Sequence, residues 1–121
     1  MLFRSAADIC RAIIGDEAVE VSLVLMLDRR HNIRGYHEVG RGGVAHSPMD
    51  PREILVAALH AGAAAIIIAH NHPSGQVEPS ADDLAVTKRV SDACTLIGIE
   101  FLDHIIVGDG TYTSLRTQGS I

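Results

Sequence analysis

The sequence has 121 residues, of which 47% are hydrophobic and only 3% aromatic, and its formal net charge is −5 at pH 7. A chain of this length and composition is expected to form one domain around a core of Ala, Ile, Leu and Val, which excludes an intrinsically disordered protein. The acidic balance argues against non-specific nucleic-acid binding, because phosphate groups require a cationic surface.

The predicted elements alternate between helices and strands. Apolar residues at helical spacing predict a helix at residues 5–14, and dense Val and Leu predict a buried strand at residues 19–28. A turn at residues 29–32 leads to a second, more exposed strand at residues 33–43. The first two strands are therefore expected to form a hairpin.

A helix is strongly predicted after residue 49. Asp50 suits the N-cap, Pro51 the first helical position and Gly62 the end of the helix, while Glu53 would complete a capping box with Asp50. These residues bound a helix of about ten residues, close to the usual length in globular proteins.

The second half of the chain continues the alternation. An apolar strand is expected at residues 63–72, a helix at 80–98, a strand at 99–108, and a short returning strand at 111–115 after a turn. Gly98 ends the helix, which is predicted from apolar residues that recur at helical spacing: Leu84, Val90, Cys94 and Ile97. The order αββαβαββ predicts an α/β protein with one mixed sheet covered by helices.

The two cysteines, Cys10 and Cys94, lie far apart in apolar helical patterns. Buried free thiols of this kind are typical of a reducing compartment, so a cytoplasmic location is expected. The first ten residues contain Arg4 and Asp8 and lack the features of a secretory signal, and no apolar run has the length needed to span a bilayer. We therefore expect no membrane association.

Two histidines at the end of a predicted strand indicate a metal site. His70 and His72 are two residues apart, so both rings point to the same side of the strand while Asn71 points away. Ser80 and Asp83 begin the next helix, from which the Asp83 carboxylate can return to the strand end. Two imidazoles and one carboxylate leave a fourth position open on a bound zinc ion, as in catalytic zinc sites.

Simpler explanations exist for the same residues. Two histidines near a strand end are more often surface or hydrogen-bonding residues than metal ligands. Ser80 and Asp83 also form an S-x-x-D capping pattern that requires no function. The two explanations are compatible, because a carboxylate at a helix N-terminus can also bind a metal ion.

The stretch HNHPSGQVEPSADD resembles the JAMM metalloprotease signature H-x-H-P-x6-S-x-x-D, the hallmark of MPN+ (JAB) domains. The stretches EVGRGGV, PREILVAAL, AAAIIIAHNHPSG and LIGIEFLDHIIVGDGTYTSL are similar to the RadC branch of that family, so that the resemblance covers residues 19–116. It implies a three-layer α/β/α fold related to cytidine deaminases. Residues 19–121 would form the RadC-like JAMM domain, and residues 1–18 a helical segment.

The resemblance also implies roles for individual residues. One zinc ion per chain would be held by His70, His72 and Asp83, with Ser80 helping to bind the oxyanion of a tetrahedral intermediate. Glu38, in YHEVGRGG, would be the general acid and base on an early strand. From the residues alone, Glu38 would instead be a solvated strand residue.

The implied activity is zinc-dependent hydrolysis of a peptide or isopeptide bond, with a peptide or a ubiquitin-like protein as the substrate. Two alternatives stay open: a protein associated with DNA repair, the label long carried by the RadC branch, and an interaction module without turnover. The family usually adds an N-terminal helical module similar to a helix-hairpin-helix unit, which residues 1–18 are too short to contain. The stretch GRGGVAHSPMDPRE also departs from the family pattern beside the expected cleft, which leaves the substrate open. The oligomeric state does not follow from the sequence.

Two further features have a structural and a functional interpretation. Asp103 and His104 interrupt an apolar strand, which favours a buried His–Asp pair; the alternative is a partner that orients a zinc-binding histidine. Four arginines within residues 29–41 favour a solvated hairpin; the alternative is a surface that meets an acidic substrate.

Overall fold

The computed structural model describes residues 5–42 and 49–121. The described elements follow in the order α1 (Ala6–Ile14), β1 (Val21–Leu27), β2 (Ile33–Arg41), α2 (Pro51–His60), β3 (Ala65–Asn71), α3 (Ala81–Ile97), β4 (Glu100–Val107), β5 (Tyr112–Ser114) and α4 (Leu115–Gln118). This order confirms the expected alternation and adds the short helix α4. Part of the stretch GRGGVAHSPMDPRE, residues 43–48, lies outside the described residues.

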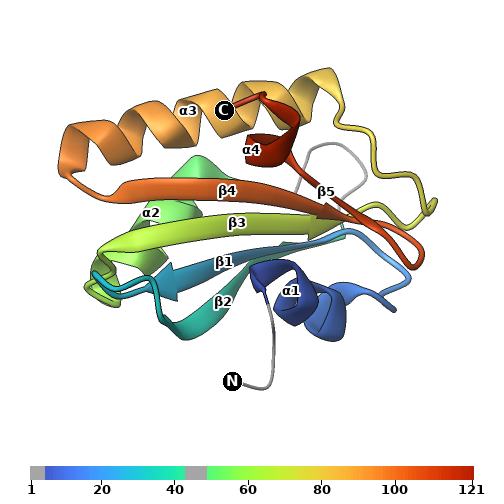
Figure 1. Cartoon of the computed structure of the whole chain (residues 1–121), viewed down its shortest axis with the longest axis horizontal. Coiled ribbons are helices and arrows are strands. Elements are labelled where there is room, and N and C mark those ends of the chain that lie inside the picture. The colour runs from blue at the N-terminus through green and yellow to red at the C-terminus, as the bar shows by residue number, and fades with distance from the viewer. Residues whose placement is uncertain (1–4, 43–48) are drawn as a thin grey trace.

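The strands form one mixed sheet in the order β2-β1-β3-β4-β5 (Figure 1). β1 pairs antiparallel with both β2 and β3, β3 and β4 are parallel, and β5 returns antiparallel to β4. Because β1 and β3 are antiparallel, the start of β1 meets the end of β3, where Ser22 lies opposite His70. This pairing brings residues near position 20 to the predicted metal site.

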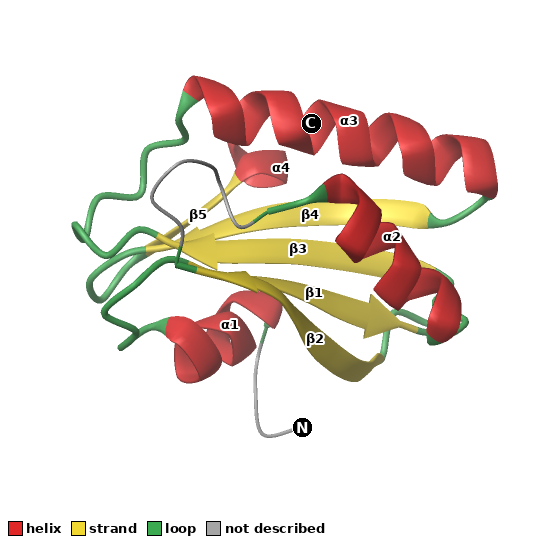
Figure 2. Cartoon of the chain, turned by 180° about the vertical axis from the view of Figure 1, so that it is seen from behind, coloured by secondary structure: helices red, strands yellow, loops and turns green. Residues whose placement is uncertain are grey.

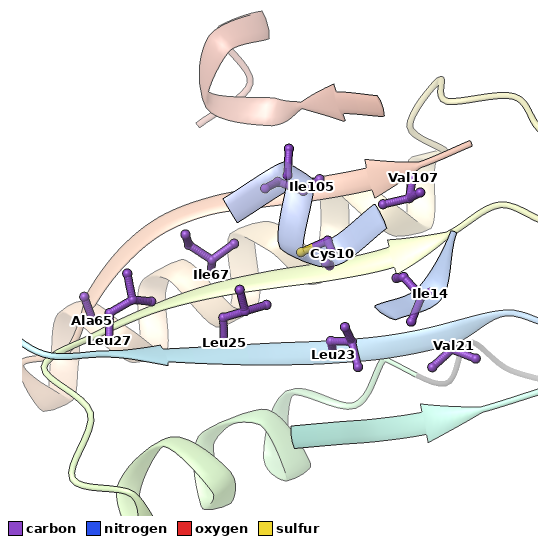
Figure 3. Packing of buried hydrophobic residues seen from close by; sticks show 12 residues of the cluster. Cys10, Ile14, Val21, Leu23, Leu25, Leu27, Ala65, Ile67, Ile105 and Val107 are labelled. Atoms are coloured by element: carbon purple, nitrogen blue, oxygen red, sulfur yellow. The ribbon is translucent and has the colours of Figure 1, made fainter. Parts of the chain in front are cut away.

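Helices cover both faces of the sheet, as Figures 1 and 2 show from opposite sides. On one face, Cys10 and Ile14 of α1 pack on alternate residues of the central strands, including Leu23 and Ile67 (Figure 3). On the other face, α2 and α3 enclose a second cluster. The architecture is therefore the expected three-layer α/β/α arrangement, and we call its two sides the α1 face and the α2/α3 face.

The N-termini of α2 and α3 are capped differently. In α3, Ser80 Oγ accepts a hydrogen bond from the Asp83 N–H and the Asp83 carboxylate accepts one from the Ser80 N–H, which is the predicted capping box. In α2, Asp50 accepts from the Arg52 N–H instead of forming the expected box with Glu53. Both helices still begin where the sequence indicates.

The buried side of α3 is only partly apolar. Of the four apolar residues at helical spacing, Val90 and Cys94 are buried, whereas Leu84 and Ile97 are 41% and 42% exposed. The helix instead buries Asp83, Thr87, Val90 and Cys94. The physical reason is that the first turn of α3 faces the histidines at the end of β3, so polar residues take the first two buried positions.

Both cysteines are buried free thiols, as expected, and burial raises the pKa to about 12 for Cys10 and about 11 for Cys94. Within residues 5–42 and 49–121, no helix is long and apolar enough to cross a membrane.

Candidate metal centre

Three predicted ligands meet at the end of β3. His70 Nε2 lies 3.0 Å from His72 Nε2 and 3.2 Å from Asp83 Oδ1, and His72 Nε2 lies 3.2 Å from Asp83 Oδ2. His70 is almost fully buried, whereas the His72 side chain is 20% exposed, so the cluster opens toward solvent on the His72 side.

These distances suit a metal ion with tetrahedral geometry. Two ligand atoms that each bind such an ion at about 2.0–2.1 Å lie about 3.4 Å apart. The two imidazole nitrogens are 3.0 Å apart, and each lies 3.2 Å from a different oxygen of the Asp83 carboxylate. Burial by itself raises the pKa of Asp83, but the hydrogen bond and charge of His70, together with hydrogen bonds from Ser80, outweigh it and hold that pKa well below its ordinary range. Asp83 is therefore ionised at neutral pH, as a ligand must be.

The partner of each ring fixes which nitrogen carries the proton. His72 Nδ1 lies 2.9 Å from the Gln76 carbonyl oxygen, which can only accept, so Nδ1 is the donor. In the neutral form of the ring, His72 Nε2 then directs a lone pair at the cluster.

A buried relay fixes the tautomer of His70 through His104 and Thr87. Thr87 Oγ1 donates its single hydrogen to the Asp83 carbonyl oxygen at 2.7 Å, so it must accept from His104 Nδ1 at 2.6 Å. Burial, followed by the charge of His70, lowers the pKa of His104 to about 3, so this ring is neutral and its Nε2 is an acceptor. His70 Nδ1 donates to that acceptor at 2.8 Å, so in the neutral form of His70 the lone pair is on Nε2.

The result is a cluster of acceptors. When both rings are neutral in these tautomers, His70 Nε2, His72 Nε2 and both Asp83 carboxylate oxygens approach one another at 3.0–3.2 Å with no hydrogen between them. Such an arrangement is electrostatically unfavourable unless a cation lies among the four atoms. A proton on His70 Nε2, which donates to Asp83 and lowers its pKa, is the cation that a metal ion would displace. The residues present therefore fit a metal ion on the chemistry of their donor atoms.

A second carboxylate, which the sequence interpretation missed, lies beside this cluster. Glu20 offers an oxygen within 4.8 Å of the His70 and His72 ligand nitrogens, and Glu20 Oε1 lies 3.8 Å from His70 Nε2. Glu20, His70 and His72 thus form a group that could hold a metal ion. Asp83, the predicted carboxylate ligand, lies closer to both rings. The sequence signal was available: Glu20 directly precedes the apolar strand VSLVLML, whose start must meet the end of β3 if the two strands are antiparallel.

The structure does not bring Glu38 to the cluster. Glu38 pairs with Leu23, which packs on the α1 face, whereas Ser22 and its partner His70 point to the α2/α3 face. A bulge between the Ser22 and Leu23 pairs sets this register. Glu38 is exposed and bonded to Arg41 at 2.7 Å, and this hydrogen bond lowers the Glu38 pKa, which makes the carboxylate a weaker base.

Ser80 lies beside Asp83 at the N-terminus of α3 and keeps its capping role. Its oxygen accepts the Asp83 N–H at 3.0 Å, and within the described residues its hydroxyl hydrogen makes no bond. Ser80 is exposed, so that hydrogen can reach a molecule bound at the cluster.

The loop after His72 is held by close backbone contacts. The His72 N–H donates to the Val107 carbonyl at 2.9 Å, and the Asp109 N–H donates to the Gly75 carbonyl at 3.3 Å. A Cβ added at Gly108 would collide with the Gly75 carbonyl oxygen, so glycine is required there for the loop to approach. This contact keeps the Gln76 carbonyl at the His72 ring.

Asp103 does not form the expected ring-to-carboxylate pair with His104. It accepts from the backbone N–H groups of His104 and Arg116, while the His104 ring bonds to His70 and Thr87. The alternative interpretation of His104, as a partner that orients a ligand histidine, is the one that the contacts support.

The hairpin arginines that form ion pairs do so with neighbouring carboxylates. Arg41 pairs with Glu17 at 2.9 Å as well as with Glu38, and Arg34 pairs with Asp28 at 3.0 Å. These contacts support the solvated-hairpin interpretation.

Comparisons with known proteins identify relatives of the chain. A family model described as a RadC-like JAB domain matches residues 3–120. A UPF0758 protein of Acidithiobacillus ferrooxidans is 46% identical over 108 residues, 89% of this chain and 48% of the relative. A UPF0758 protein of Paracidovorax citrulli is 40% identical over 118 residues, 98% of this chain and 50% of the relative. The chain thus spans about half the length of these curated relatives.

Proposed function

The chain belongs to the RadC-like JAB domain family, and on this premise we propose that it is a zinc-dependent hydrolase that cleaves a peptide or isopeptide bond. The observation that carries the proposal is the convergence of two imidazole lone pairs and an ionised carboxylate, with a second carboxylate 3.8 Å from His70 Nε2. Ligands and a separate proton carrier in one place are what metal-assisted hydrolysis requires.

Zinc is the ion that we propose, one per chain. His70 Nε2, His72 Nε2 and Asp83 would hold it, and this set of two histidines and one carboxylate occurs in catalytic zinc sites that keep one position open. When bound, zinc polarises a carbonyl group and lowers the pKa of water.

Two further residues receive roles from their positions. Glu20, in place of Glu38, is the proposed general base and acid, because its Oε1 is at the edge of the cluster and its side chain is 31% exposed. Ser80 is the proposed donor to the oxyanion, since its hydroxyl oxygen is fixed by the Asp83 N–H and its hydrogen is directed by no bond within the described residues.

We propose a substrate class that follows from the amide chemistry. A peptide or a ubiquitin-like protein would present the amide, and a cytoplasmic location would suit the two buried thiols. A role in DNA repair is the alternative, against which the net charge of −5 counts. The second alternative is an interaction module without turnover. The presence of both the proposed metal ligands and a proposed proton carrier at one site counts against it.

The experiment compares zinc content and cleavage in the same proteins. Zinc-loaded protein is incubated with a peptide library and with oligonucleotides, and the products are identified by mass spectrometry. We expect peptide cleavage that His70→Ala abolishes together with zinc binding. Glu20→Gln should lower turnover by about 10²–10⁴-fold, the usual effect of losing a general acid or base.

The matched control is Glu38→Gln, an equivalent substitution on the opposite face of the sheet, which should leave turnover near wild type. Cleavage of oligonucleotides instead of peptides would favour the DNA-repair alternative. Zinc binding without any cleavage would favour the interaction module.

A further inference from the structure

The side chain of Asn71 lies between the two histidines in sequence but on the other face of the sheet. Its Oδ1 accepts from the Val21 N–H at 2.6 Å, and its Nδ2 donates to the Val19 carbonyl at 2.9 Å. Nδ2 is also 3.4 Å from the Glu17 carbonyl. Asn71 is 3% exposed, so these bonds form in a region from which water is excluded.

The two short bonds flank one residue, Glu20. Val19 and Val21 are its chain neighbours, and the Glu20 carbonyl itself accepts from the Gly42 N–H at 2.7 Å. Both backbone neighbours of Glu20 are thus bonded to a single carboxamide, which is attached to the strand residue between His70 and His72. Since the carboxamide is planar and its acceptor and donor are both in use, it constrains the segment more than a single hydrogen bond does.

We propose that Asn71 is a positioning residue that keeps the Glu20 carboxylate beside the metal ligands. The strand that aims the two histidines at the α2/α3 face presents Asn71 to the α1 face, where it holds the chain that carries the proton carrier. Residues 70–72 therefore position the two histidines on one face of the sheet and, through Asn71 on the other face, the segment that carries Glu20. The role of Glu20 as proton carrier rests on the proposed function, whereas the hydrogen bonds of Asn71 do not depend on it.

The test is a double-mutant cycle on metal affinity, which requires no turnover. Zinc dissociation constants are measured by chelator competition for wild type, Glu20→Gln, Asn71→Ala and the double variant. Removing the Glu20 charge beside a divalent cation should weaken binding by about tenfold, the lower end of the range for groups around metal ligands. Asn71→Ala should weaken it by a similar factor, because Glu20 is no longer held near the site.

If Asn71 acts through Glu20, the double variant should bind zinc about as well as Glu20→Gln alone. If Asn71→Ala instead disturbs the histidines on either side, the two losses multiply to about 100-fold. Multiplying losses would overturn the proposal, as would an Asn71→Ala variant with wild-type affinity.

Hydrogen exchange provides a readout of the contact itself. The Val21 amide should lose protection in Asn71→Ala, whereas Asn71→Asp, which keeps the acceptor for that amide, should retain most of it. The Asp variant also keeps the test usable if the Ala variant does not fold. Asn32→Ala is the control, because the Asn32 side chain donates to Asp28 in the turn between β1 and β2.

The two proposals fail in different ways. A non-multiplying cycle in a protein that cleaves nothing would refute the proposed hydrolase and support the positioning of Glu20. Cleavage that depends on zinc, together with multiplying losses in the cycle, would support the hydrolase and overturn the role of Asn71.

Discussion

Thr87→Val removes one hydroxyl from the relay and changes little else. Valine matches threonine in shape, and Thr87 is buried on the side of α3 that faces the sheet. The Asp83 carbonyl keeps its ordinary partner, the backbone N–H one helical turn on. His104 Nδ1–H, however, loses its acceptor at 2.6 Å.

The size of the effect follows from the two states available to His104. If the ring keeps its proton on Nδ1, a buried donor is left unsatisfied at a cost of about 1–3 kcal/mol. If the proton moves to Nε2, that nitrogen becomes a donor to His70 Nδ1, and the proton of His70 must move to Nε2 among the ligand atoms. Metal binding requires the state in which His104 keeps its proton on Nδ1. The cost of the unsatisfied donor therefore lowers the metal affinity by about 5-fold to 150-fold.

Chelator competition measures this loss, and two-bond proton–nitrogen NMR spectra of the imidazole rings identify the tautomers. In wild type, His70 should carry its proton on Nδ1; in metal-free Thr87→Val, a share of His70 should carry it on Nε2. Thr87→Ser restores the hydroxyl and should restore both the affinity and the tautomer.

The control is Thr95→Val on the same helix. Thr95 makes the same bond to the carbonyl four residues earlier, at 3.1 Å, but it is exposed, and none of the described histidines contacts it. Thr95→Val should therefore bind zinc as wild type does. Wild-type affinity in Thr87→Val would refute the reasoning, because the hydroxyl would then not control the ring that faces His70.

Three further predictions address other parts of the site. Glu38→Gln should leave zinc content unchanged, because Glu38 bonds to Arg41 on the opposite face of the sheet; a marked loss of zinc would contradict this placement. Gly108→Ala should weaken zinc binding by about tenfold or more, because the loop at Gly75 must move away from its contact; a variant with wild-type affinity would show that the contact is dispensable. In urea unfolding of the metal-free protein, the free energy of unfolding should fall by about 2 kcal/mol between pH 6.5 and pH 5. The reason is that the pKa of His104 is about 3 in the folded protein and 6.5 in the unfolded chain, so the unfolded state takes up the proton first as the pH falls. His104→Gln should reduce this dependence of stability on pH, and an unchanged dependence would exclude His104 as its source.

The sequence alone determined the features that depend on neighbours along the chain. The spacing of His70 and His72 places both rings on one side of a strand, whatever that strand pairs with. Ser80 and Asp83 are three residues apart at a helix start, and this spacing is sufficient for the capping box that the structure contains. Helix and strand positions followed from periodicity for the same reason, because each pattern is complete within its own segment.

The tertiary structure decided which distant residues lie beside those histidines. Glu20 reaches His70 because β1 runs antiparallel to β3, and Glu38 faces away because a bulge in the β1–β2 pairing sets its register. His104 and Thr87 meet His70 only after β4 and α3 pack on β3. A shift of one residue in strand pairing reverses the face of every side chain, and pairing across fifty residues is set by burial of the whole sheet rather than by local pattern.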